Sequence, residues 1–313
     1  MQSKTREQLV KMYLEALKEN KIPWRERWYS DLNKNGVTNT EYKGVNQLIL
    51  SYVAYKEKYK DDRWLTYKQI KENNYKITNA KGKGVPIEFW SVYDIKNKIR
   101  LDFPAYEKII EKTPEKQKDF KVFCNTTYVF NASLIEGIKP NEKNNKNTIP
   151  TNIYFKRLIS KLHIEYIEEG DKAYYIPSKD TIVLPPSSKF FDKYSYYATQ
   201  LHELSHATGH SDRLNRNLNI QNKRDYAREE LIAEISSSFL MQKLNVKVKE
   251  DDYNNHKSYI QSWIQLLEDK PNELFKAVGE ANKICDYLDS KVKNKECFWT
   301  GKVCCLCWAN CGT

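Results

Sequence analysis

Two histidines and a glutamate within one short stretch have the residue types and the spacing of a metal site. His202, Glu203 and His206 form the pattern His-Glu-x-x-His, and on a helix this spacing places both imidazoles on one face, one turn apart. The two histidines could therefore share a metal ion, and the pattern predicts zinc. Glu203 would then act as the general base on a zinc-bound water, which is the chemistry of amide hydrolysis.

A third ligand is expected, because a catalytic zinc ion usually has three protein ligands and one open position. Glu230 is the first candidate. Glu234, one turn further along the same predicted helix, would orient a histidine through the ring nitrogen that does not bind the metal. The alternative is Asp212, which occupies the last position of the longer pattern His-Glu-x-x-His-x-x-Gly-x-x-His with aspartate in place of histidine. We favour Glu230, because Asp212 could equally form a surface ion pair with Arg213.

The elements that must position these residues can be predicted from the spacing of apolar residues. Around the motif, Tyr197, Leu201 and Leu204 recur at helical spacing, and Gly209 stands where a helix stop belongs. A strand pair is expected just before this helix, at residues 173–176 and 181–184. The back half should otherwise be helical, with helices over residues 151–162, 224–243, 255–268 and 271–293.

The front half mixes helices and strands without a repeated strand-helix-strand unit, so we predict an α+β class for the chain. Helices are expected over residues 5–19 and within 42–59, and a strand over 85–90. A strand pair at 120–123 and 127–131 is expected to close this half.

The chain is long enough for two domains. Its 313 residues exceed one average domain, and 40% hydrophobic residues with 13% aromatics are typical of a globular protein. Residues 139–150 are polar and flanked by prolines, which predicts a linker. The expected organisation is a domain over 1–138, the linker, a mainly helical domain with a small sheet over 151–293, and a tail over 294–313.

Several classes of protein are disfavoured. No apolar run approaches the ~18 residues of a membrane span, and the first residues lack the apolar segment of a signal peptide, so we expect a cytoplasmic protein without membrane contacts. Of the seven cysteines, only Cys124 and Cys285 lie outside residues 294–313, too few for a disulfide framework. The tail cysteines match no zinc-ribbon spacing, and we assign them no function.

The positive charge is concentrated in the front half. Residues 1–148 hold 29 Lys and Arg against 19 Asp and Glu, a net of +10, whereas residues 149–313 hold the other 23 against 22, a net of +1. A basic half rich in aromatics favours a nucleic-acid partner. A solvated, lysine-rich surface is the alternative explanation.

Aromatic and basic side chains occur together in this half in a way that suits single-stranded DNA, whose bases stack on rings while its backbone attracts cations. One such cluster joins two tryptophans, which could instead be core residues, to two arginines; its members are Trp24, Arg25, Arg27 and Trp28. Lys81 and Lys83 alternate with glycines in a loop that could approach phosphates closely, although it lacks the spacing of a P-loop.

Dispersed motifs in one order resemble those of ArdC-type antirestriction proteins. The back half is similar to that family's zincin-like metallopeptidase domain over 173–185, 196–210, 213–216 and 226–234. The front half is similar to its single-stranded-DNA-binding domain at Pro23, Trp24, Trp28, 42–46, 63–69 and 81–84. This resemblance covers about residues 5–292 and adds further candidate DNA contacts, namely Tyr42, Asn46, Arg63, Trp64 and Lys68.

The resemblance implies a protein of plasmids, conjugative elements or phages that binds single-stranded DNA and helps incoming DNA to evade restriction. A host protein of the restriction system is a further expected partner. Whether the chain is an enzyme stays open, because the zincin fold could serve as a metal-stabilised binding module. The alternative is a cytosolic zinc metallopeptidase whose basic domain recruits a protein substrate. A nuclease is disfavoured, because the acidic clusters of two-metal phosphodiester chemistry are missing.

Overall fold

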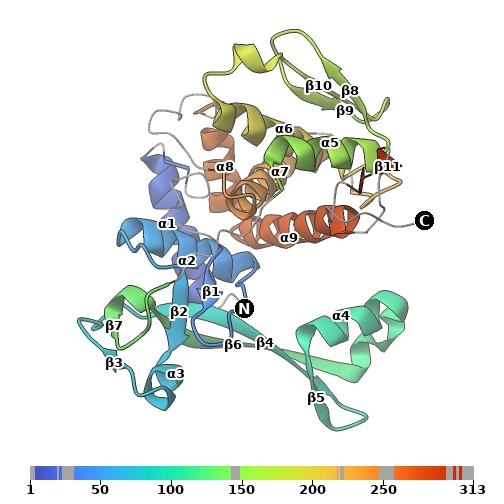
Figure 1. The fold of residues 1–313 in the computed structure, drawn as a ribbon. Helices are drawn as coiled ribbons and strands as arrows, with labels where there is room; N and C mark the ends of the chain where they lie inside the picture. Colours follow the sequence, from blue (N-terminus) through green and yellow to red (C-terminus); the bar gives the residue numbers. More distant parts are fainter. Residues whose placement is uncertain are drawn as a thin grey trace.

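The computed structural model describes residues 4–19, 21–22, 32–141, 149–216, 218, 222–246, 257–293, 299–300 and 303–304. Helices and separate small sheets make up this part of the chain, which confirms the α+β class. In Figure 1 the helices of the back half lie above the main sheet of the front half. Within the described residues, no helix combines the length and the apolar character that crossing a bilayer requires.

Five strands form the main sheet of the front half, in the order β1-β2-β6-β4-β5. Their bounds are β1 (Lys34–Asn35), β2 (Arg63–Thr66), β4 (Val85–Asp94), β5 (Ile99–Asp102) and β6 (Phe120–Asn131). Only β1 and β2 pair in parallel; the other neighbours are antiparallel. The ends of β4 and β6 run outward together and carry β5 and the helix α4 (Phe103–Lys112) at their far end (Figure 1). We call this projecting part the arm.

The predicted strand pair at residues 120–123 and 127–131 is wrong, because β6 is one continuous strand. Cys124, Asn125 and Thr126, which should have separated the two strands, are each paired with a residue of β4. Extended pairing along the whole of β4 therefore overrides the local preference of these polar residues for a turn. Short elements complete this half: α3 (Tyr67–Glu72), β3 (Lys76–Ile77), η1 (Pro114–Asp119), η2 (Ala132–Leu134) and β7 (Ile135–Glu136).

The back half has the expected helices and a small sheet. The helices are α5 (Thr151–Lys161), α6 (Lys193–Ala207), α7 (Lys223–Lys243), α8 (Lys257–Asp269) and α9 (Asn272–Lys293). The sheet has the order β8-β10-β9, with the single turn η3 (Ser187–Lys189) after it; its strands are β8 (Glu165–Glu168), β9 (Tyr174–Ile176) and β10 (Thr181–Leu184). The antiparallel β9–β10 pair was predicted, whereas β8, which is parallel to β10, was not. Of the tail, only the backbone of β11 (Trp299–Thr300) and β12 (Val303–Cys304) is described.

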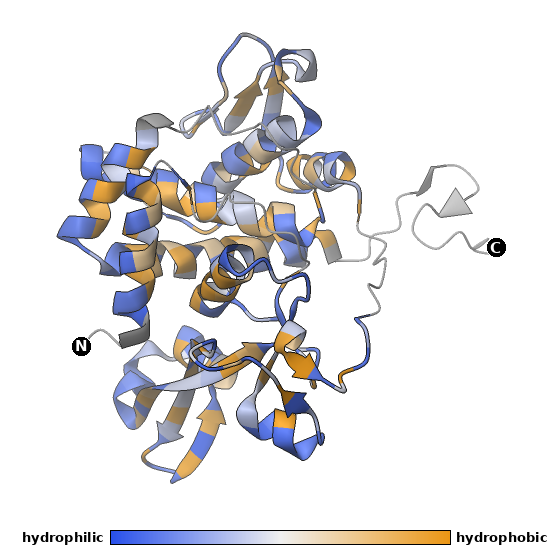
Figure 2. Cartoon of the chain, turned by 90° about the vertical axis from the view of Figure 1, so that its left-hand side faces the viewer, coloured by the Kyte–Doolittle hydropathy of each residue, from blue (hydrophilic) through white to orange (hydrophobic). Residues whose placement is uncertain are grey.

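One hydrophobic core runs through both halves. It includes Leu9 of α1 (Lys4–Lys18) and Leu48 of α2 (Gly44–Lys56) together with Leu231 of α7 and Trp263 of α8. Figure 2 shows hydrophobic residues recurring along the helices between hydrophilic ones, as packing against a shared core requires. The front-half helices α1 and α2 therefore share their core with the helices that position the candidate site.

Candidate metal centre

Two neighbouring helices, α6 and α7, carry the candidate metal ligands. The first helix begins after Asp192, whose carboxylate accepts a hydrogen bond from the backbone N–H of Ser195 at 2.8 Å. The second begins after Asn222, whose side chain accepts from the backbone N–H groups of Arg224 and Asp225. Each cap satisfies N–H groups that the first turn leaves without a partner, and so it fixes where the helix starts.

The predicted helix stop at Gly209 is confirmed, and a close approach explains the glycine. α6 ends at Ala207, and a Cβ at position 209 would lie 2.7 Å from the side chain of Leu218. Arg213 then ties this end of α6 in place, because its Nε donates to the Ala207 carbonyl at 2.7 Å and its guanidinium pairs with Asp180. Arg213 is thus a buried clamp and not the partner of Asp212.

His202, His206 and Glu230 come together between the two helices, with one ligand atom of each lying within 4.8 Å of the others. The two Nε2 atoms are 3.1 Å apart. They lie 3.4 Å and 3.6 Å from carboxylate oxygens of Glu230. Ligand atoms placed tetrahedrally about 2 Å from a zinc ion are about 3.3 Å apart. The separation of the two Nε2 atoms is close to this value, and each Nε2 atom approaches a different oxygen of Glu230.

The other ring nitrogen of each histidine faces a carboxylate. Nδ1 of His202 lies 3.3 Å from a carboxylate oxygen of Glu234, but the two atoms are not aligned for a hydrogen bond. Nδ1 of His206 makes a hydrogen bond of 3.1 Å with Glu229. Such partners hold an imidazole in the tautomer that points Nε2 at a metal.

The sequence analysis missed the role of Glu229 and of the arginine that supports it. Arg216 donates to the Glu229 carboxylate at 2.8 Å, to the carbonyl of Ser205 at 2.8 Å and to the hydroxyl of Thr208 at 2.7 Å. It therefore links α7 to the end of α6. The adjacent glutamates at 229 and 230 were a usable signal, because one carboxylate can bind the metal while its neighbour orients a histidine.

The charges at this centre suit a bound cation. Burial raises the pKa of Glu203, whose side chain has no hydrogen-bonding partner among the described residues. Burial lowers the pKa of His202, but the carboxylates of Glu230 and Glu234 outweigh it and raise this pKa well above its usual value. Burial also raises the pKa of Glu230. The interactions with His202 and His206 together outweigh burial and lower this pKa. A cation between these groups would offset the excess of buried negative charge.

The alternative ligand, Asp212, lies away from this centre. Its side chain is 83% exposed and is 3.8 Å from the Nδ1 atom of His210. Both residues belong to the turn that follows α6. The structure thus places Glu230, and not Asp212, beside the two histidines.

Two tyrosines lie at the rim of the centre. The hydroxyls of Tyr226 in α7 and Tyr259 in α8 are 3.1 Å apart. Burial, the bond to Tyr259 and the nearby Glu230 carboxylate raise the pKa of Tyr226, so its hydroxyl is a neutral hydrogen-bond donor at physiological pH. Sequence reasoning had no signal for this pair, because the two helices meet only in the folded chain.

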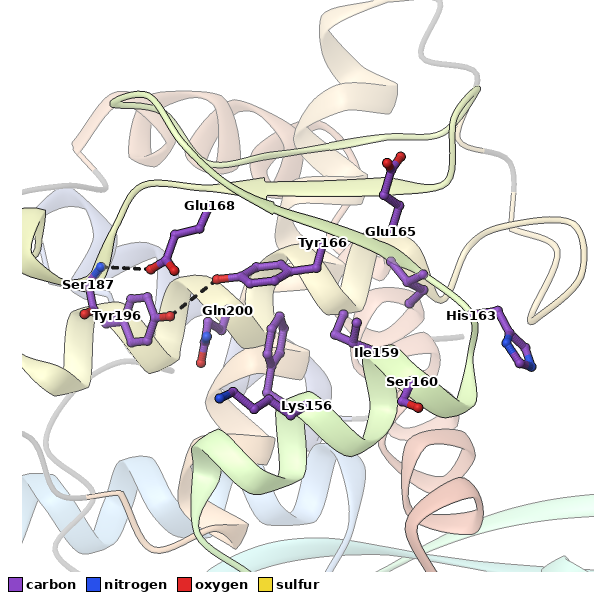
Figure 3. Close-up of a pocket in the computed structure, with 12 residues that line it drawn as sticks. Lys156, Ile159, Ser160, His163, Glu165, Tyr166, Glu168, Ser187, Tyr196 and Gln200 are labelled. Atoms are coloured by element: carbon purple, nitrogen blue, oxygen red, sulfur yellow. Dashed lines mark hydrogen bonds between the residues drawn. The ribbon is translucent and has the colours of Figure 1, made fainter.

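A cavity of about 650 Å³ lies on another side of α6, between α5 and β8 (Figure 3). Tyr196 and Gln200 of α6 face Tyr166 of β8 across it, and the two tyrosine hydroxyls are 3.4 Å apart. None of the three candidate metal ligands lines this cavity. It is therefore separate from the metal centre.

The residues predicted to contact DNA lie in different environments in the structure, and some of them lie outside the described residues. Trp24, Arg25, Arg27 and Trp28 lie outside the described residues. The prediction for Trp64 is wrong: its side chain is 0% exposed and its Nε1 donates to Asn33 at 2.7 Å, so no base can stack on it. The family resemblance over residues 63–69 indicated this tryptophan, but its ring belongs to the hydrophobic core.

The remaining candidates divide into engaged and exposed side chains. Arg63 pairs with Asp61, Lys83 pairs with Glu57, and Asn46 braces β4 by two hydrogen bonds with the backbone of Glu88. Tyr42 is half-buried against the core. Lys68, 82% exposed on α3, makes only a surface ion pair of 3.6 Å with Glu72, and Lys81, in the loop before β4, is exposed as well.

Replacement of Glu229 with alanine should weaken metal binding by about 10–100-fold, because residues that orient metal-bound histidines contribute that much. The variant would also leave Arg216 buried without its carboxylate partner. Isothermal titration of the metal-stripped protein measures the change, with thermal unfolding as a check of the fold. A Glu169→Gln variant, altered at an exposed glutamate of the same half, is the control. An unchanged affinity in the Glu229 variant would contradict the assigned role.

Two family models match the chain, one in each half. The N-terminal domain of anti-restriction factor ArdC matches residues 3–130, and a zincin-like metallopeptidase matches residues 154–280. The solved structures that resemble it include the antirestriction ArdC protein from the R388 plasmid. The metal-free form is 25% identical, with a TM-score of 0.71, and the match covers 94% of this chain and 100% of that one. The Mn(II)-bound form is 26% identical, with a TM-score of 0.72, and the match covers 93% and 99%.

Curated relatives are longer or of similar length. Two proteins named DNA primase TraC, from Escherichia coli, are 33% and 32% identical over 90% of this chain. The chain spans 27% and 20% of their lengths, about a quarter. An uncharacterised protein, y4eC from Sinorhizobium fredii, is 27% identical over 91% of each chain.

Proposed function

The chain belongs to the ArdC-type antirestriction proteins, and from this premise we propose that it is a single-stranded-DNA-binding protein of a mobile element that carries a zinc site. The front half binds the DNA, and His202, His206 and Glu230 hold the ion. The observation that carries the metal part is the convergence of the two Nε2 atoms and the Glu230 carboxylate between α6 and α7. Two histidines and one carboxylate are a ligand set that zinc commonly takes. The Mn(II)-bound form of the R388 protein supports a divalent metal in this fold.

The residues around the centre have the arrangement of a hydrolytic site. When bound, zinc would supply a Lewis acid that polarises a water molecule and a substrate carbonyl. Glu203 follows the ligand His202 in α6, and no other described side chain forms a hydrogen bond with its carboxylate. Glu203 would therefore accept a proton from the water molecule and pass it to the leaving amine. Glu229 and Glu234 would hold the two imidazoles in their binding tautomers.

A cytosolic zinc metallopeptidase, with the basic front half recruiting a protein substrate, is the second candidate function. The same centre supports it, because amide hydrolysis needs no residue beyond those already described. The two functions differ in what the front half binds. In the second function, the partner of the front half would be the protein that the metal centre hydrolyses.

A DNA partner is supported by the charge and by the relatives. The net of +10 over residues 1–148 attracts phosphates, and two relatives are named as DNA primases. We do not extend primase activity to this chain, because it spans about a quarter of those proteins.

Binding to a single-stranded oligonucleotide is expected to weaken steeply with salt. If the protein neutralises about four phosphates, a plot of log affinity against log salt concentration should have a slope near −3. Fluorescence anisotropy with a labelled oligonucleotide measures it, and a duplex of the same sequence tests the preference for single strands. Absent binding, or binding that salt does not change, would reject a DNA-binding front half.

A further inference from the structure

The helix α4 covers part of one face of the arm, on which Val122 of β6 stays 39% exposed, and leaves the other face uncovered. On the covered face, Trp90 packs against Phe103 of α4 with ring centroids 5.7 Å apart, and Tyr106 of α4 packs against Phe120 at 5.4 Å. Side chains alternate between the two faces of a strand, so their neighbours in sequence point the other way. In Figure 1, α4 lies beside the far end of β4 and β5.

The strand register identifies the residues of the uncovered face. Directly paired residues share a face, and the pairs here are Phe89 with Asn125, Ser91 with both Phe123 and Asp102, and Tyr93 with both Lys121 and Arg100. A hydrogen bond from Asn125 to the Ser91 hydroxyl at 3.3 Å agrees with this assignment. We call this set of residues the arm face.

Two phenylalanine side chains on the arm face are exposed to solvent. Phe89 is 62% exposed and Phe123 is 47% exposed, although both are residues that folding normally buries. The register makes them diagonal neighbours, about 7–8 Å apart along the sheet. Two successive unpaired bases could therefore each stack on one ring.

Two cations lie at the Tyr93 end of the arm face. Lys121 and Arg100 are exposed on either side of Tyr93, and within the described ranges neither has an ion-pair partner. Asp102, which pairs with Ser91 on this face, accepts a hydrogen bond from the backbone N–H of Ala105 at 2.7 Å and keeps its negative charge. The two cations therefore exceed the one carboxylate, and phosphates would neutralise the excess positive charge.

The exposed rings and the positive charge indicate which ligand the arm face binds. A second copy of this chain would bring the cations of two arm faces against one another, and like charges oppose such a contact. Duplex DNA hides the flat surfaces of its bases, whereas a single strand exposes them to aromatic rings. We propose that the arm face is a binding platform for single-stranded DNA, on which bases stack on Phe89 and Phe123 while Lys121 and Arg100 contact the backbone. The proposal rests on the DNA-binding function proposed above.

A Phe89→Ala/Phe123→Ala variant tests the proposal. Its affinity for a labelled single-stranded oligonucleotide should fall by at least about 20-fold, because each stacked base contributes strongly to binding. A Lys121→Ala/Arg100→Ala variant should instead reduce the salt dependence, lowering the slope by about 1.4. Phe191→Ala is the matched control, since this phenylalanine is 77% exposed but lies in the back half, and it should bind as the wild type does.

The results of these binding experiments distinguish a failure of the arm-face proposal from a failure of the proposed DNA-binding function. If the wild-type protein binds the oligonucleotide and both arm variants bind equally well, the platform is rejected while DNA binding stands. If the wild-type protein does not bind, the proposed function fails and the platform fails with it. Thermal unfolding of each variant checks that the exposed substitutions leave the fold intact.

Discussion

A protein in which glutamine replaces Glu203 is expected to retain its metal but to lose about 10²–10⁴-fold in any peptide hydrolysis that it catalyses. General bases contribute rate factors of this size, and an amide cannot accept the proton. Metal binding should persist, because Glu203 is not one of the three side chains whose ligand atoms converge. The measurement is hydrolysis of a protein substrate alongside metal content, with Glu169→Gln as the control.

The same variant distinguishes the two proposed functions. Protection of transferred DNA in a restricting host can be measured for wild type and for Glu203→Gln. If protection disappears while the metal remains bound, hydrolysis is part of the function. If protection is unchanged, the back half acts as a metal-stabilised binding module and the metallopeptidase function is contradicted.

Replacement of Glu230 with alanine should weaken metal binding by more than the ~10–100-fold that supporting residues contribute. Glu230 supplies the carboxylate nearest to both Nε2 atoms, and its removal leaves two histidines, too few for a stable zinc site. Competition with a chromophoric chelator measures the affinity for Zn²⁺ and Mn²⁺.

Asp212→Ala is the matched control for the third ligand. This carboxylate is 83% exposed and lies beside His210, so its removal should leave the affinity as in the wild type. A loss of metal in the Asp212 variant, with Glu230→Ala unaffected, would show that the third ligand has been misassigned.

Residues with local signals were predicted well. The helix around His202 follows from apolar spacing within its own sequence, and the carboxylates at 230 and 234 share a face of one helix, so their distance to each other is set locally. The structure then places both beside the histidines. What the sequence could not supply is the contact between α6 and α7, which is why Asp212 stayed open as an alternative.

Residues whose surroundings come from distant segments were predicted poorly. Trp64 is buried because it belongs to the core that both halves share and because Asn33 accepts its N–H, and neither feature has a local signal. Phe89 and Phe123 face solvent together only because β4 and β6 pair in one register. Arg216 reaches Glu229 across a turn that no periodicity describes. Side-chain exposure, unlike helix position, depends on tertiary contacts.

The central claim is that α6 and α7 hold one divalent ion between His202, His206 and Glu230. Crystals soaked in Zn²⁺ or Mn²⁺ and measured at the absorption edge of the metal test it most directly. We predict one anomalous peak about 2 Å from the Nε2 atoms of both histidines and from a Glu230 oxygen, absent in a His202→Ala/His206→Ala variant. A peak at Asp212, or no peak in the wild-type protein, would contradict the assignment.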